Sequence, residues 1–150
     1  MKLTDTQHQA LADRLFQAVR EGRGVDPPSL TLDYDFDDAY RVRRKLVDHL
    51  IAAGGKPKGH KIGFTSQAMQ KMYGMTGPDF GILLDTMFTP HTTPVRISHM
   101  ANTRAEPELA FELSHPLHGA VSIADVLAAT SRIWAAIEVI DSPVGAMKAG

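Results

Sequence analysis

The sequence predicts an α+β fold in which N-terminal helices are followed by a mixed, β-rich sheet. Residues 4–22 and 37–55 each carry apolar residues at helical spacing, and each stretch ends at glycine. After residue 57, short apolar runs typical of strands alternate with brief helical stretches. We therefore expect an N-terminal helical region, 1–57, and a partial β-rich region, 58–150, that together form one continuous domain.

The two long helices are predicted from their ends as well as their periodicity. Thr4 or Asp5 can cap the first helix, and Gly22 is expected to end it. Asp37 is expected to cap the second helix, which Gly54 and the glycine after it should stop.

The remaining elements are shorter. Brief helices are expected over 66–74 and 122–130, the latter with a capping pair, Ser122 and Asp125. Strands are expected within 59–63, 82–84, 104–113 and 132–141, the last of them buried. Because so few strands leave an open edge, we expect a sheet that is incomplete or completed by a partner, and hence a homo-oligomer.

Composition excludes several classes of protein. A formal net charge of −1 offers no attraction for nucleic acid or an anionic membrane, and the chain has no cysteine for disulfide or thiolate chemistry. The first residues lack the apolar core of a signal peptide, and no apolar run has transmembrane length. We expect a cytoplasmic protein with no nucleic-acid or membrane partner.

The stretch "RAEPELAFEL", residues 104–113, places two carboxylates two positions apart. On a strand, Glu106 and Glu108 share one face. A solvated surface would explain the pair, and so would a bound divalent cation such as Mg²⁺, Mn²⁺ or Ca²⁺. Asp141 is a plausible third ligand, whereas Glu138 alternates away from it and could support the site from outside. The opposite face is expected to pack in the core: Leu109, Phe111 and Leu113.

Two further residues are candidates for acid–base chemistry. Lys61 lies in "GHKIG", where the flanking glycines permit close backbone approach, and it could act as an acid, a base or a carboxylate binder. Asp79 lies in "GPDFG" and could be a general acid or base at a loop tip. A lysine at a strand end and ordinary turn chemistry are the structural alternatives.

Four motifs in order resemble those of a known family: "GHKIGFTSQAMQ", "PDFGILLDTMF", "RAEPELAFEL" and "AAIEVIDS". They resemble the 2-oxopent-4-enoate hydratase family, which includes 2-oxohept-4-ene-1,7-dioate hydratase and 4-oxalocrotonate decarboxylase, within the fumarylacetoacetate hydrolase superfamily. The helical opening also looks like the start of that family. The resemblance implies a fold of the fumarylacetoacetate hydrolase type.

The resemblance also implies a site and an activity. Glu106, Glu108 and Asp141 would bind Mg²⁺ or Mn²⁺, and Lys61 and Asp79 would be the catalytic residues of the substrate pocket. The implied reaction adds water to a 2-hydroxy-2,4-dienoate (2-oxo-4-enoate) to give a 4-hydroxy-2-oxo acid, in aromatic meta-cleavage catabolism. Vinylogous decarboxylation of a 2-oxo acid is the alternative within the family. The implied partners are this small-molecule substrate, further copies of the chain and a paired pathway enzyme.

Two departures separate this sequence from the family pattern. Pro143 stands where family members usually have arginine, and the family continues beyond the point at which "VGAMKAG" ends this sequence. On this pattern the chain is expected to be C-terminally truncated. A non-catalytic remnant that binds metal or a partner is therefore a third interpretation.

Overall fold

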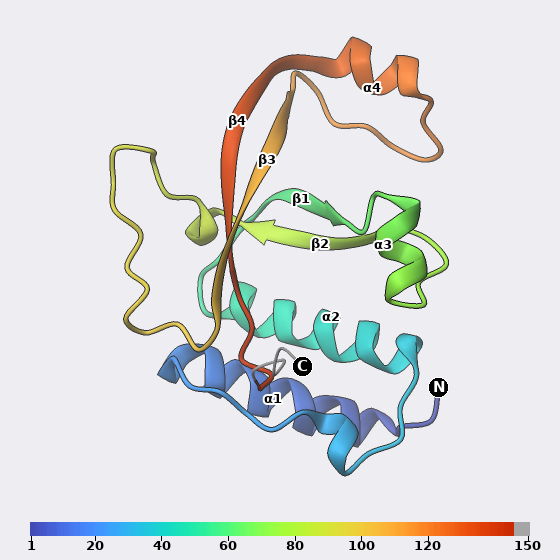
Figure 1. Ribbon diagram of the computed structural model, residues 1–150, viewed down its shortest axis with the longest axis vertical. Coiled ribbons are helices and arrows are strands. Elements are labelled where there is room, and N and C mark those ends of the chain that lie inside the picture. Colours follow the sequence, from blue (N-terminus) through green and yellow to red (C-terminus); the bar gives the residue numbers. More distant parts are fainter. Residues whose placement is uncertain (146–150) are drawn as a thin grey trace.

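The computed structural model describes residues 1–145 and confirms an α+β fold (Figure 1). Its longer helices, α1 and α2, come first, and the strands and two short helices follow. Residues 146–150, the end of the predicted region 58–150, lie outside the described residues. The helices are α1 (Asp5–Glu21), α2 (Phe36–Ala52), α3 (Gln67–Met72) and α4 (Ile123–Ala129), and the strands are β1 (Pro57–Gly63), β2 (Asp79–Leu84), β3 (Thr103–Leu113) and β4 (Thr130–Asp141).

Helix α1 begins and ends as predicted. The Thr4 hydroxyl accepts a hydrogen bond from the Gln7 backbone N–H, and the Gln7 side chain accepts one from the Thr4 N–H. This capping box satisfies two backbone donors that the first turn cannot. At the other end, Gly22 adopts a left-handed conformation with φ of 60°, which glycine tolerates best.

Helix α2 begins two residues earlier than predicted, with Asp35 rather than Asp37 as its cap. The Asp35 carboxylate accepts a hydrogen bond from the Asp38 N–H at 3.0 Å, and the Asp38 carboxylate accepts one from the Asp35 N–H at 3.1 Å. Both partners of a capping box are therefore present at this spacing, which explains why Asp35 is the cap.

The two long helices pack against each other around a small apolar core of Leu11, Ala12 and Val42. Beside it, the fully buried Asp38 carboxylate lies 2.8 Å from Nε2 of the buried His8. Burial alone would raise the pKa of Asp38, but hydrogen bonds from the Lys2 and Leu3 N–H groups, with those from His8 and Asp35, hold it well below its usual value. The N-terminal residues are thereby tied to α2.

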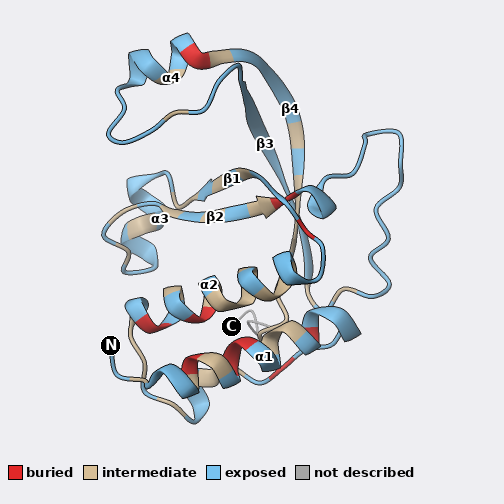
Figure 2. Cartoon of the chain, turned by 180° about the vertical axis from the view of Figure 1, so that it is seen from behind, coloured by how far each residue is buried: buried red, intermediate tan, exposed pale blue. Residues whose placement is uncertain are grey.

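The strands form two separate antiparallel sheets instead of the single mixed sheet we expected. Strand β1 pairs with β2, so that Lys61 lies opposite Gly81, and β3 pairs with β4, so that Glu106 lies opposite Glu138. Each sheet has two strands. The β1–β2 pair lies next to α2, and the longer β3–β4 pair runs crosswise past one end of it (Figures 1 and 2). Strand β2 starts at Asp79, three residues before the apolar run that predicted it.

The predicted core face of β3 is exposed, which corrects our expectation. Leu109 is 65% exposed and Phe111 is 49% exposed, and most of β4, which we expected to be buried, is exposed as well (Figure 2). Within residues 1–145, these side chains therefore remain largely in contact with solvent. The predicted incompleteness of the sheet stays a prediction. Within residues 1–145, no helix has the length and apolar composition that a bilayer crossing requires.

Candidate metal centre

Three carboxylates meet on one face of the β3–β4 sheet. Glu106 and Glu108 share this face because they are two residues apart on β3, and Glu138 joins them because β4 places it directly opposite Glu106. One oxygen from each side chain lies within 4.8 Å of the others. Among the residues that the structure describes, this is the one group of three or more acidic, histidine or cysteine side chains with such spacing.

The donor set fits a hard divalent cation. Oxygens bound to one cation at about 2.1–2.4 Å are at most about 4.2–4.8 Å apart, so three oxygens that lie within 4.8 Å of one another can share one ion. Three carboxylates without nitrogen or sulfur ligands suit Mg²⁺, Mn²⁺ or Ca²⁺. Glu106 and Glu108 are exposed and Glu138 is half-buried, so a cation and its remaining ligands could reach the cluster from solvent.

Asp141 is placed differently from our expectation. It lies on the opposite face of β4 from Glu138, since the two residues are three positions apart on the strand, and it pairs with Thr103. Its carboxylate accepts a hydrogen bond from the Asn102 backbone N–H at 2.8 Å. The structure therefore brings Glu106 and Glu108 together with Glu138 and leaves Asp141 outside the cluster.

Lys61 reaches the cluster from the other sheet. Its Nζ lies 3.1 Å from Oε1 of Glu138, although the two residues belong to different strand pairs. The aliphatic part of Lys61 lies over Gly81, where an added Cβ would be only 3.2 Å from its Cγ. Glycine at position 81 thus leaves room for the side chain to lie across β2.

Asp79 contacts α2 instead of the acidic cluster. The Tyr40 hydroxyl donates a hydrogen bond to Oδ1 of Asp79 at 2.8 Å, and Nη1 of Arg43 donates to the same oxygen at 3.1 Å. Arg43 also donates to the Phe80 carbonyl, and its guanidinium lies over the rings of Tyr40 and Phe80. These contacts fix the start of β2 against α2.

The same contacts shift the pKa of Asp79. Burial raises its pKa, but the hydrogen bond from Tyr40, the Phe80 N–H and the charge of Arg43 together lower the pKa below its usual value. The pKa of Tyr40 is raised, chiefly because its hydroxyl donates to this carboxylate. At neutral pH Asp79 is therefore ionised and Tyr40 is protonated.

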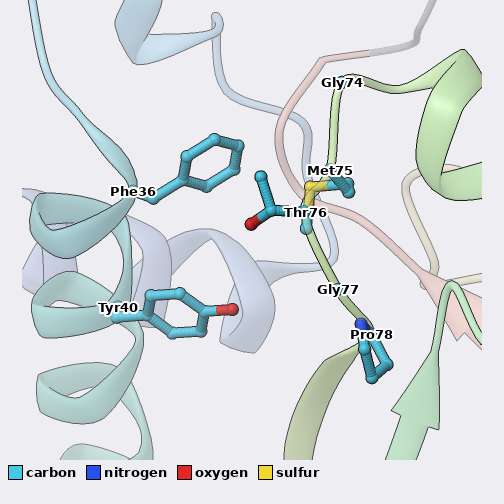
Figure 3. Close-up of a pocket in the computed structure, with 7 residues that line it drawn as sticks. All are labelled: Phe36, Tyr40, Gly74, Met75, Thr76, Gly77 and Pro78. Carbon is cyan, nitrogen blue, oxygen red and sulfur yellow. The ribbon is translucent and has the colours of Figure 1, made fainter.

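A cavity of about 250 Å³ lies between the start of α2 and the 74–78 loop (Figure 3). Tyr40 and Phe36 form one side of it, and Met75, Thr76 and Pro78 form the other. None of the three clustered glutamates lines this cavity. Because Tyr40 both lines the cavity and holds Asp79, it connects the cavity to that carboxylate.

The sequence pattern missed part of this site. It gave Glu138 a supporting role only, and it gave no role to Tyr40, Arg43 or Gly81. The alternation of β4 already separates Glu138 from Asp141, so knowledge of the strand pairing would have selected Glu138. The contacts of Asp79 with α2 join residues 36 and 39 positions apart, for which no local signal exists.

No family model matches the chain. Individual proteins do match it. A 2-hydroxypent-2,4-dienoate hydratase of Pseudomonas putida is 40% identical over 137 residues, covering 89% of this chain and 62% of the relative. A 2-oxo-hept-4-ene-1,7-dioate hydratase of Escherichia coli is 40% identical over 139 residues, covering 90% of this chain and 51% of the relative.

Solved structures give the same result for the fold. The 4-oxalocrotonate decarboxylase of Pseudomonas putida G7, complexed with magnesium and adipate, superposes with a TM-score of 0.89 at 30% identity, over 97% of this chain and 56% of that one. The same enzyme has also been solved with calcium and acetate. The chain is thus homologous to the hydratases and decarboxylases that the sequence motifs resemble. It spans between half and two thirds of the length of these relatives.

Proposed function

We propose that this chain acts in a divalent-metal-dependent hydration, in which water adds to a 2-hydroxy-2,4-dienoate (2-oxo-4-enoate) to give a 4-hydroxy-2-oxo acid. The observation that carries the proposal is the cluster of Glu106, Glu108 and Glu138 with the Lys61 ammonium beside it. The relatives named as dienoate and oxo-heptenedioate hydratases supply the substrate class. The corresponding biological role is aromatic meta-cleavage catabolism.

Glu106, Glu108 and Glu138 would hold the cation, which we propose to be Mg²⁺ or Mn²⁺. When bound, such an ion supplies Lewis-acid polarisation of a 2-oxo acid chelated through its carboxylate and 2-oxo oxygens. Support for a divalent ion comes from the oxygen-only donor set and from the magnesium and calcium complexes of the related decarboxylase.

Lys61 and Asp79 would divide the proton transfers between them. Asp79 is ionised at neutral pH, so it can accept a proton but has none to donate. The Lys61 ammonium lies next to the carboxylate cluster and can donate a hydrogen bond or a proton to an oxygen of a ligand held there. General acid–base catalysis of this kind contributes about 10²–10⁴-fold to a rate.

The first test titrates Mn²⁺ into the Glu106→Gln/Glu108→Gln double variant and measures the binding by calorimetry. We expect Mn²⁺ affinity to fall by at least about 100-fold and dienoate turnover to be lost, because two ligands are removed while the side-chain volume is kept. Glu112→Gln is the matched control, since Glu112 lies on the same strand and face but is hydrogen-bonded to the Trp134 indole. Unchanged Mn²⁺ affinity in the double variant would refute the metal site.

A comparison of two further variants identifies the third ligand of the cation. We expect Glu138→Gln to weaken Mn²⁺ binding and Asp141→Asn to leave it nearly unchanged, because only Glu138 faces the other two glutamates. If instead Asp141→Asn weakened Mn²⁺ binding and Glu138→Gln did not, Asp141 would be the third ligand.

The second candidate function is vinylogous decarboxylation of a 2-oxo acid. It is favoured by the close superposition on 4-oxalocrotonate decarboxylase, whereas the greater sequence identity to the hydratases favours hydration. Product analysis with 2-hydroxypenta-2,4-dienoate and with 2-oxohex-3-enedioate separates the two. A non-catalytic role corresponds to Mn²⁺ binding without turnover of either compound.

The remaining predictions concern assembly and location. Homo-oligomerisation, a paired pathway enzyme and a cytoplasmic location stay predictions. Sedimentation of the purified chain tests the first of them.

A further inference from the structure

Lys61 is held in place by both of the sheets that it connects. Its stem lies over Gly81 on the partner strand of its own sheet, and its Nζ lies 3.1 Å from the Glu138 carboxylate on the other sheet. The Lys61 side chain is 38% exposed and that of Glu138 is 25% exposed, so solvent screens this pair only partly. The lysine is therefore positioned relative to the cluster by packing as well as by charge.

The ammonium adds a fixed positive charge to a cluster of three carboxylates. Of the ion pairs within residues 1–145, Lys61–Glu138 is the one that involves a member of the cluster. A divalent cation held by these three glutamates is repelled by the ammonium and must share Glu138 with it.

We propose that the Lys61 ammonium competes with the cation for Glu138 and so lowers the metal affinity of the cluster. Metal binding is thereby coupled to the position of the Lys61 ammonium. The inference rests on the proposed metal site and deepens it. A cation that draws Glu138 to itself weakens the hold of this carboxylate on Nζ, so the ammonium becomes available to a ligand bound at the cluster. A lysine that contacted only the substrate would leave metal affinity unchanged when removed.

The experiment is a Mn²⁺ titration of the full chain and three variants, in the absence of substrate. Lys61→Met keeps the aliphatic stem over Gly81 and removes the charge, so we expect Mn²⁺ to bind about 3- to 5-fold more tightly. Lys61→Arg retains the charge and should bind Mn²⁺ within about 2-fold of the unaltered chain.

Lys58→Met is the matched control for the loss of one positive charge from the same strand. The Lys58 ammonium lies over the ring of Phe88, 4.5 Å from its centroid, and among the ion pairs within residues 1–145 none joins it to the three clustered glutamates. We expect the Lys58→Met variant to bind Mn²⁺ with the same affinity as the unaltered chain. Circular dichroism of each variant reports folding, and Lys61→Gln replaces Lys61→Met if the latter does not fold.

The outcomes separate this inference from the metal site itself. Equal affinity in Lys61→Met and Lys58→Met, or weaker binding in Lys61→Met, would overturn the inference while the cluster remains a metal site. If neither the unaltered chain nor Lys61→Met binds Mn²⁺, the metal site and the inference both fail. Adding Glu106→Gln/Glu108→Gln to Lys61→Met should abolish the tighter binding, which locates that binding at the cluster.

Discussion

The pKa of Asp79 is lowered in part by a tyrosine that lies 39 positions away in the sequence. The Tyr40 hydroxyl donates to Oδ1 of Asp79, and Arg43 donates to the same atom. Because these donors stabilise the ionised form, the pKa of the carboxyl lies below its ordinary value of 3.8. A group with a lowered pKa stabilises the folded state above its unfolded pKa, and this contribution is lost as the pH falls through the folded pKa.

We therefore predict that Tyr40→Phe raises the pKa of Asp79, since it removes one donor while keeping the ring beside Phe80. The stabilisation that Asp79 provides should then be lost at a higher pH than in the unaltered chain. An NMR titration of the aspartate carboxyl carbons measures the shift directly.

Tyr34→Phe is the control for Tyr40→Phe, because it deletes a hydroxyl from the segment just before α2 and leaves the Tyr40–Asp79 hydrogen bond in place. An Asp79 titration that is identical in Tyr40→Phe and in the unaltered chain would contradict the role of Tyr40.

At the scale of single elements, the end of α1 depends on a close approach between two segments. A Cβ at Gly22 would lie 2.1 Å from the carbonyl oxygen of His99, which precedes β3. Gly22 also has a φ of 60°, a conformation that costs a residue with a side chain about 1–2 kcal/mol. Two penalties therefore act at this position, one from the backbone and one from the contact.

Gly22→Ala and Gly74→Ala separate the two penalties. Gly74 has nearly the same conformation, with φ of 65°, but nothing lies within 4 Å of a Cβ built there. We expect Gly74→Ala to lower the free energy of unfolding by about 1–2 kcal/mol and Gly22→Ala to lower it by about 3 kcal/mol or more. Urea denaturation measures the free energy of unfolding of both variants. Equal decreases in the two would show that the segment around His99 moves aside without loss of stability.

The elements also show which features the sequence could predict. The start of α4 was predicted well because a local pair, Ser122 and Asp125, defines it. The Asp35–Asp38 pair that caps α2 was missed in favour of Asp37. The two-sheet arrangement was not predictable, because an apolar run indicates a strand without saying which strand it pairs with. The choice between Glu138 and Asp141 depended on that same pairing, since only the register with β3 brings Glu138 opposite Glu106.

At the scale of the whole molecule, the β3–β4 sheet has two faces of opposite chemistry. One face carries the glutamate cluster, and the other carries apolar side chains that the described residues leave exposed. Leu109 and Ile137 are each 65% exposed on that face, and Phe111 and Ile133 lie beside them in the register. A contiguous apolar surface of this kind is typical of an interaction surface, and it also promotes association.

We predict that the 150-residue chain binds the dye ANS through this face, and that Leu109→Ser/Ile137→Ser lowers the dye fluorescence by about half. The free energy of unfolding should change little, because both side chains are already largely exposed. Leu30→Ser is the control, since Leu30 is 71% exposed but lies outside the β3–β4 sheet, just before α2. Unchanged fluorescence in the double variant would mean that the face is covered in solution. Sedimentation over a range of concentrations would then show whether a second copy of the chain covers it.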